Sequence, residues 1–264
     1  MTIVQRLGDS GFLVPVAMFC VVAVWETFSP QRPVTQPIGR RWVCNFSLIF
    51  LNGIVFKLAA PVTGAAISAI AASRGFGLFN NWSPGLAVVL IVSVPTLDLA
   101  QYWAHRCMHR ARWLWLIHRV HHSDLDFDLS TGFRFHPFEA ALMMVPRAAV
   151  IAALGVPISG VLLHGLLTYL SNLFQHANVA IGEASDRALR RAIVTPGMHS
   201  VHHQVGHAES NSNFGTLFSF WDRLFGTYRE PESESKQVFG LPEFREIGEV
   251  GLRRMLLMPF LKSG

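Results

Sequence analysis

Histidine is concentrated in this sequence in a way that suits metal binding. Twelve histidines occur in 264 residues, and most fall into three short strings, HxxxH once and HxxHH twice. On a helix, position i+4 lies about 40° from position i, and i+3 about 60° to the other side, so each string turns its imidazoles toward one side. Together the strings offer more ligands than one ion uses, which predicts a two-metal centre. The ligands would be His105, His109, His118, His121, His122, His199, His202 and His203.

An isolated histidine is weaker evidence for a metal site than a histidine string. A lone histidine is more often a satisfied core or surface residue, and one HxxxH string is common by chance. The combination of three strings is different, because burying so many imidazoles without ligands would leave costly unpaired nitrogens. We therefore interpret His164, in an apolar run, and His207, in a polar loop, as residues that bind no metal. Cysteine is too sparse and too scattered for a disulfide framework or a thiolate zinc site.

The elements that position these strings read as membrane helices. Hydrophobic residues make up 51% of the chain and charged residues 15%, against about 25% in a soluble domain. We expect an all-α integral membrane bundle of about four spans, the last a hairpin interrupted at Gly155-Val156-Pro157, with a break in the second near Pro61 and Gly64. The apolar stretches are Ser10–Phe28, Val43–Ala72, Pro84–Trp103 and Ala140–Phe174.

Charge distribution predicts the orientation. The loop after the first stretch carries Arg32, Arg40 and Arg41, whereas the next carries only Arg74, so the first loop should be cytoplasmic. Nearly all the histidines then lie on the cytoplasmic face, in a helical cap. The net charge of +5 is clustered at membrane ends and predicts no nucleic-acid partner. The expected division is 1–103 membrane helices, 104–139 first part of the cap, 140–174 membrane hairpin, and 175–264 second part of the cap and tail.

The two ends of the chain carry separate expectations. No small-x-small cleavage site follows the first apolar run, so we interpret it as an uncleaved span. Near the other end, Gly251–Leu261 is basic and apolar, and it would either lie on the membrane surface or pack as an ordinary helix.

Several longer strings resemble the fatty acid hydroxylase/sterol desaturase superfamily. The resemblance covers about 95–227, with motif order and spacing in agreement. The matching strings are Asp98–Arg110 (DLAQYWAHRCMHR), Leu116–Ser123 (LIHRVHHS), Arg134–Glu139 (RFHPFE), Thr195–His203 (TPGMHSVHH), Asn213–Gly215 (NFG) and Trp221–Thr227 (WDRLFGT). The resemblance implies an all-histidine di-iron centre that uses O2 against an unactivated C–H bond. It also implies a ninth ligand, His176, while Asn172 stands where some hydroxylases have a histidine, so Asn172 or water would complete one metal.

Ligating imidazoles need an acceptor for their second nitrogen. Asp98 is the first candidate, since an acid before His105 in an apolar helix needs a partner. We interpret His136 as a supporting or structural residue. The further acceptor candidates are Asp124, Asp126, Glu139, Asp186 and Asp222.

The function expected from the resemblance is hydroxylation or desaturation of a lipid-like substrate such as a fatty acyl chain, sterol or carotenoid. Imidazoles also suit zinc, which can occupy such a site in a purified sample. The sequence has no flavin, haem or ferredoxin motif, so electrons would come from a separate donor protein. That donor would dock on Arg106, Arg110, Arg112 and Arg119, unless these arginines contact lipid. The alternatives are a membrane metal-dependent hydrolase, which the lack of HExxH disfavours, and a metal transport or storage protein.

Overall fold

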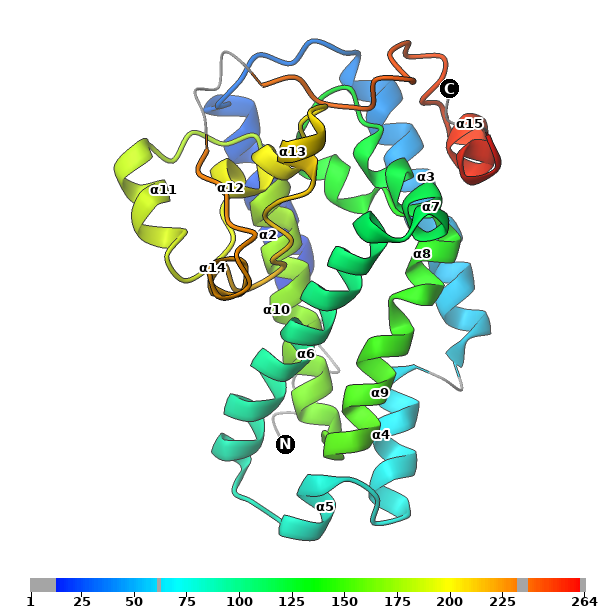
Figure 1. Cartoon of the computed structure of the whole chain (residues 1–264), viewed down its shortest axis with the longest axis vertical. Helices are drawn as coiled ribbons and strands as arrows, with labels where there is room; N and C mark the ends of the chain where they lie inside the picture. Colours follow the sequence, from blue (N-terminus) through cyan, green and yellow to red (C-terminus); the bar gives the residue numbers. More distant parts are fainter. Residues whose placement is uncertain (1–12, 61–62, 232–236, 262–264) are drawn as a thin grey trace.

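Helices make up the fold. The computed structural model describes residues 13–60, 63–231 and 237–261, and in these ranges regular structure is helical, with only isolated β-bridges such as Pro30 to Val179. The all-α prediction is therefore confirmed. Figure 1 shows long helices standing side by side below a region of short helices and loops.

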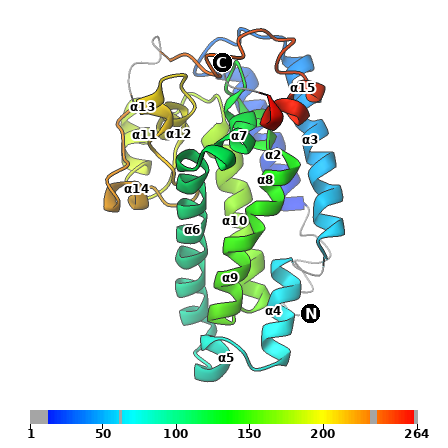
Figure 2. The ribbon, with the colours of Figure 1, turned by 45° about the vertical axis from the view of Figure 1, so that its right-hand side comes forward.

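The upright helices form the membrane part. Three helical segments are long and apolar enough to cross a bilayer, namely α3 (Ile38–Leu58), α6 (Leu86–Arg110) and the consecutive helices α8 (Pro137–Leu142) and α9 (Met144–Leu154). They stand beside α2 (Leu13–Phe28), α4 (Gly64–Ser73) and α10 (Ile158–His176) (Figures 1 and 2). Large apolar side chains remain exposed on the outside of this bundle, among them Val21 and Phe50, at 59% and 73%. Such surfaces suit contact with lipid rather than water.

Two interruptions in the apolar stretches are where the sequence predicts them. The second stretch divides into α3 and α4, and Thr63 caps α4 by accepting a hydrogen bond from the Ala66 N–H at 3.4 Å; Pro61 lies outside the described residues. The fourth stretch reverses direction after α9, where Gly155 adopts a left-handed conformation with φ +65° and Pro157 precedes α10. Glycine adopts this conformation at no steric cost, so the expected hairpin has a local cause.

The short elements gather at one end of the bundle. They are α7 (Arg112–His122), the 3-10 turn η2 (Leu129–Phe133), α11 (Glu183–Leu189), α12 (Pro196–His202), α13 (His207–Ser210), α14 (Phe220–Leu224) and α15 (Leu252–Leu257) with η4 (Met258–Phe260). Another short helix, α5 (Leu78–Trp82), lies at the opposite end (Figure 1). The sequence predicts a span that ends near Trp103, but α6 continues to Arg110, so the first histidine string lies on its extension.

The C-terminal segment packs as an ordinary helix. Met255 and Met258 are fully buried against Leu48 and Val120. The Arg119 guanidinium, itself 0% exposed, donates hydrogen bonds to the Met258 and Leu261 carbonyls at 2.5 and 2.6 Å. This packing corrects one expectation: a buried Arg119 cannot belong to a docking surface for an electron donor.

Candidate metal centre

Nine histidines converge in two adjoining groups. Within each group, one ring nitrogen of every histidine lies within 4.8 Å of those of the others. The first group contains His105, His109, His118, His122 and His202. The second contains His121, His176, His199 and His203. These are the nine positions that the sequence and the resemblance single out as ligands, and four separate helices, α6, α7, α10 and α12, bring them together with His203 just beyond α12.

Each HxxHH string contributes to both groups. From α7, His118 and His122 enter the first group while His121 enters the second; from α12 the assignment is reversed, since His202 enters the first group. Adjacent helical residues point about 100° apart, so neighbouring imidazoles cannot serve one ion but can serve two. The expectation that each string points at one side is therefore too coarse.

Spacing between the Nε2 atoms fits shared ligation of an ion. His105 and His122 place Nε2 at 3.1 and 3.2 Å from Nε2 of His118. In the second group, Nε2 of His176 lies 3.0 Å from that of His199 and 3.3 Å from that of His121. Imidazole nitrogens bound at right angles to an ion at about 2.1 Å would be about 3.0 Å apart. A neutral pair can place only one proton between two such nitrogens, so hydrogen bonding alone does not satisfy these sets.

Four of the imidazoles are oriented through Nδ1. Nδ1 of His118 donates to the Glu139 carboxylate at 2.6 Å. The other three donate to backbone carbonyls, at 2.7 to 2.9 Å: His105 to Phe214, His176 to Asn172 and His202 to Ser212. A proton held on Nδ1 leaves the Nε2 lone pair free for a metal.

Burial keeps the cap histidines neutral. Desolvation lowers the pKa of His118 to about 3. Burial, followed by repulsion from neighbouring imidazoles, places the pKa of His199 and His203 well below the usual value, and His202 behaves alike. Neutral imidazole is the form that binds metal ions, so the fold keeps these side chains in the form that a metal ion would need.

The supporting acids differ in what they hold. Glu139 occupies the place expected of an acceptor for a ligand imidazole, and its Oε2 has no hydrogen-bond partner among the described residues. Asp98 does not: its carboxylate accepts from the Leu217 and Phe218 N–H groups and from the Trp221 indole, at 3.0, 3.1 and 2.9 Å. The acid in the apolar helix thus has partners, but they belong to α14 and the loop before it, and His105 is not among them.

Asp222 and Asn172 act through the backbone. Asp222 accepts from the N–H groups of Phe214 and Gly215, both at 2.8 Å, and thereby fixes the carbonyl that receives the proton of His105. The side-chain amide of Asn172 donates to the Gly132 carbonyl at 2.7 Å, and the backbone carbonyl of Asn172 accepts from Nδ1 of His176. The amide nitrogen of the Asn172 side chain is thus engaged by the backbone of η2.

The remaining histidines lie outside both groups. His136 caps α8, since its Nδ1 accepts from the Phe138 N–H at 3.1 Å. His164 is buried in α10, where its Nε2 lies 3.5 Å from the Thr168 hydroxyl. His207 is exposed at the start of α13.

The candidate acids of the first cap loop hold α3 and its N-terminal approach. Asp124 accepts from the Arg41 Nε and Nη2 at 2.8 and 2.9 Å. Asp126 accepts from the N–H groups of Thr35 and Gln36. Asp186, the last candidate, pairs with Arg190 within the cap.

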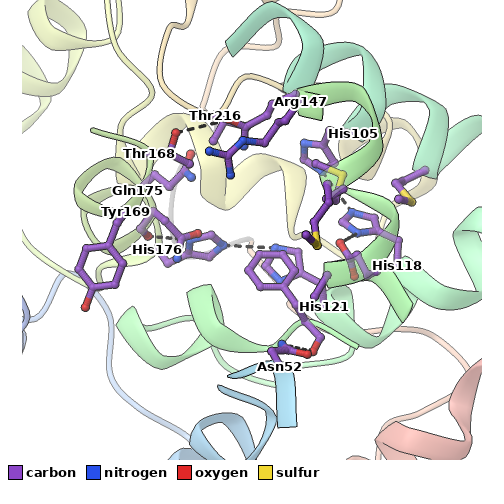
Figure 3. Close-up of a pocket in the computed structure, with 18 of the residues that line it drawn as sticks. Asn52, His105, His118, His121, Arg147, Thr168, Tyr169, Gln175, His176 and Thr216 are labelled. Atoms are coloured by element: carbon purple, nitrogen blue, oxygen red, sulfur yellow. Dashed lines mark hydrogen bonds and ion pairs between the residues drawn. The ribbon is translucent and has the colours of Figure 1, made fainter. Parts of the chain in front are cut away.

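A cavity of about 360 Å³ adjoins both histidine groups and extends between α3, α6, α9 and α10 (Figure 3). Its size is within the range of small-molecule sites. The histidines that reach it are His105, His118, His121, His176 and His199. Glu139 and Asn172, which the sequence also singled out, line the cavity as well. Sequence reasoning missed other lining residues, including Asn52, Gln101, Arg147, Thr168 and Gln175. Arg147 carried a usable signal, as an arginine within an apolar stretch.

Fold and site together define a helical membrane protein with an all-histidine candidate metal centre. Residues 89–227 match the family model described as fatty acid hydroxylase, a range that contains all nine grouped histidines. The chain belongs to this family, and the superfamily resemblance of the sequence is confirmed.

Relatives support this assignment. The chain is 32% identical over 252 residues to an ornithine lipid hydroxylase of Rhizobium tropici, covering 92% of this chain and 73% of the relative. It is 30% identical over 168 residues to an alkylglycerol monooxygenase of Danio rerio, covering 62% of this chain and 35% of that one. A Δ7-sterol 5(6)-desaturase of Aspergillus fumigatus is 26% identical over 137 residues, 52% of this chain and 38% of the relative. No solved structure matches the chain. The chain is therefore an enzyme of the hydroxylase and desaturase class.

Proposed function

We propose that the two histidine groups each bind one iron ion and that the chain uses O2 to hydroxylate or desaturate a lipid. The convergence of nine imidazoles beside a cavity carries the proposal. Imidazole donors suit iron, copper and zinc, and the nitrogen spacings fit one ion in each group. When bound, a reduced iron pair would supply the activation of O2 that removal of hydrogen from an unactivated carbon requires.

The chain's own residues would orient the ligands and exclude water. Glu139 and the carbonyls of Asn172, Ser212 and Phe214 fix four rings, so little reorganisation accompanies binding. On the cavity side, Met108, Phe135, Met143 and Met144 provide an apolar lining. Such a lining suits a hydrocarbon chain and keeps solvent from the reacting carbon.

A lipid would reach the cavity from the side. Phe56 of α3 lines the cavity and is 46% exposed, and its helix carries other exposed apolar side chains such as Phe50 and Leu58. The cavity therefore meets the surface that faces lipid, which supports a substrate drawn from the bilayer. The names of the relatives, a lipid hydroxylase, an alkylglycerol monooxygenase and a sterol desaturase, support the same substrate class.

Topology and electron supply complete the proposal. We place the cap, 104–139 with 175–264, on the cytoplasmic face beside membrane helices 1–103 and hairpin 140–174, because arginine gathers in the loop at 32–41. A separate donor protein would supply electrons at that face. Arg110 remains exposed there.

Iron content and O2 consumption test the proposal. Protein produced with added iron should contain about two irons per chain and consume O2 with a reductant and membrane lipid. His203→Ala should lose both properties in part or whole, whereas His207→Ala, at an exposed histidine outside both groups, should match the wild type. A lipid profile of cells with and without the gene would then identify the product. Protein with fewer irons and no O2 consumption would contradict the oxygenase and favour a hydrolase or transport role.

A further inference from the structure

Arg147 is a cation that lines the cavity, and the described residues offer its guanidinium no hydrogen-bond partner. It lies on α9, within a segment apolar enough to span a membrane. Its Nε is buried and has no hydrogen bond, and among the described residues no carboxylate or carbonyl accepts from the guanidinium. Figure 3 shows its side chain reaching into the pocket that the histidines border.

Two other charged side chains of the helices, Arg41 and Asp98, are compensated, unlike Arg147. Arg41 pairs with Asp124 and Asp128, and Asp98 accepts three hydrogen bonds. On the helical face of Arg147, the nearest acid is Glu139, eight residues or about 12 Å along the helix, and it is engaged by His118. Arginine stays protonated in proteins. A charged residue inside a membrane span is costly, and it marks a functional site when it faces an internal cavity.

Polar side chains surround this end of the cavity. The Thr168 hydroxyl, three residues beyond Gly165 on α10, lies 3.4 Å from Oε1 of Gln101. Together with Arg147, these groups make one end of the cavity polar, while the methionine-lined part is apolar. A ligand that matches both parts is an amphiphile with a charged group at one end.

We propose that Arg147 binds the oxyanion of an anionic lipid substrate, a carboxylate or a phosphate, while the hydrocarbon chain extends toward the histidines. As a statement about substrate, this inference rests on the proposed function. A planar guanidinium forms paired hydrogen bonds with either oxyanion. The guanidinium lies beside Gly165, where an added Cβ would be 4.0 Å from Nη2. Since eleven residues, or about 16 Å of helix, separate Gly165 from His176, the anchor would place a fixed length of chain between the anion and the metal groups.

Equilibrium binding to the full-length protein in phosphatidylcholine nanodiscs tests the anchor. The probes are tritiated hexadecanoate, hexadecyl phosphate and, as the neutral control, hexadecanol. We expect the wild type to bind one or both anions more tightly than the alcohol, and Arg147→Gln to lose about 10- to 100-fold in affinity for them, the worth of a charged hydrogen-bonded pair. Hexadecanol should bind both proteins equally. Preference between the two anions identifies the oxyanion.

Two further variants separate charge from folding. Lys57→Gln removes an exposed cation of α3 that does not line the cavity and should bind as the wild type. Arg147→Lys keeps the charge but not the planar fork, so it should weaken anion binding several-fold and leave the alcohol unchanged. Unaltered anion binding in Arg147→Gln, an equal loss for all three probes in Arg147→Lys, or an alcohol that binds as tightly as the anions would overturn the proposal. The binding assay needs no turnover, so it is independent of the test of the oxygenase. A negative binding result would leave the iron content and O2 consumption valid, and a protein without iron or O2 consumption could still show binding of the anion.

Discussion

The junction between α3 and the cap depends on one buried carboxylate, Asp124. Its two oxygens accept from the Arg41 Nε and Nη2 at 2.8 and 2.9 Å, from Asn45 at 3.1 Å and from Thr131 at 2.8 Å. Asp124 follows His122 by two residues, so this network fixes the position of the α7 histidines relative to the membrane helices. We predict that Asp124→Asn strongly destabilises the fold.

The size of the stability loss depends on which hydrogen bonds of Asp124 an asparagine can still make. Its single carbonyl can take the place of Oδ2 and keep three acceptances, but its amide then faces the Arg41 Nε, donor against donor. Breaking a buried ion pair from one side costs about 3–5 kcal/mol. Arg41 retains Asp128 at 2.7 Å, so we expect the lower end, about 3 kcal/mol.

A matched control is Glu183→Gln, which breaks the exposed i,i+4 pair of Glu183 with Arg187 on α11. That pair should contribute only about 0.2–0.5 kcal/mol. The assay is the free energy of unfolding, from titration of the micelle-bound protein with sodium dodecyl sulfate. Equal losses in the two variants would refute the claim that burial makes the Asp124 network strong.

The same carboxylate gives a pH dependence. Burial opposes ionisation of Asp124, but Arg41 and Arg134 outweigh it and hold its pKa well below the usual range. Its contribution to stability is therefore complete above the ordinary aspartate pKa and is lost as the pH falls through the lower folded value. The Asp124→Asn variant should lack this acid-induced loss.

Two further predictions concern the metal centre. Loss of one histidine should weaken iron binding more in the group of four than in the group of five. By elemental analysis, His203→Ala should therefore retain one iron, whereas His109→Ala should retain both. Full iron content in His203→Ala would contradict the grouping. Metal-free protein should lose stability as the pH falls below about 6.5, because the unfolded chain protonates imidazoles that the fold keeps neutral, as the pKa of His118 at about 3 illustrates. The unfolding midpoint of chelated protein against pH measures this, and a flat profile would exclude it.

The helices were predictable where the sequence carries local signals. Apolar length marks α3 and α6, and Gly155 with Pro157 marks the reversal between α9 and α10. The end of α6 was not predictable, because nothing in its local sequence stops the helix after Trp103. The destination of Asp98 was equally hidden, since its partners, Leu217 to Trp221, lie about 120 residues away.

At the site, string spacing and family resemblance identified nine histidines, but not how they divide between two groups. That division depends on how α7 and α12 face each other, which is a tertiary property. The cavity lining was out of reach for the same reason, because Asn52, Gln101 and Thr168 come from three different helices.

The two histidine groups and the fold must stabilise one another. Nine imidazoles buried among themselves have nitrogens that cannot all be satisfied by hydrogen bonds, and Nδ1 of His121, His122 and His199 has no partner among the described residues. One cation in each group would bind the nitrogen lone pairs that point toward one another there. The carbonyls that orient His105 and His202 belong to Phe214 and Ser212, in a loop that Asp222 fixes. Metal binding should therefore tighten the α12–α14 region onto α6, so loss of metal should loosen this part of the cap before the membrane helices separate.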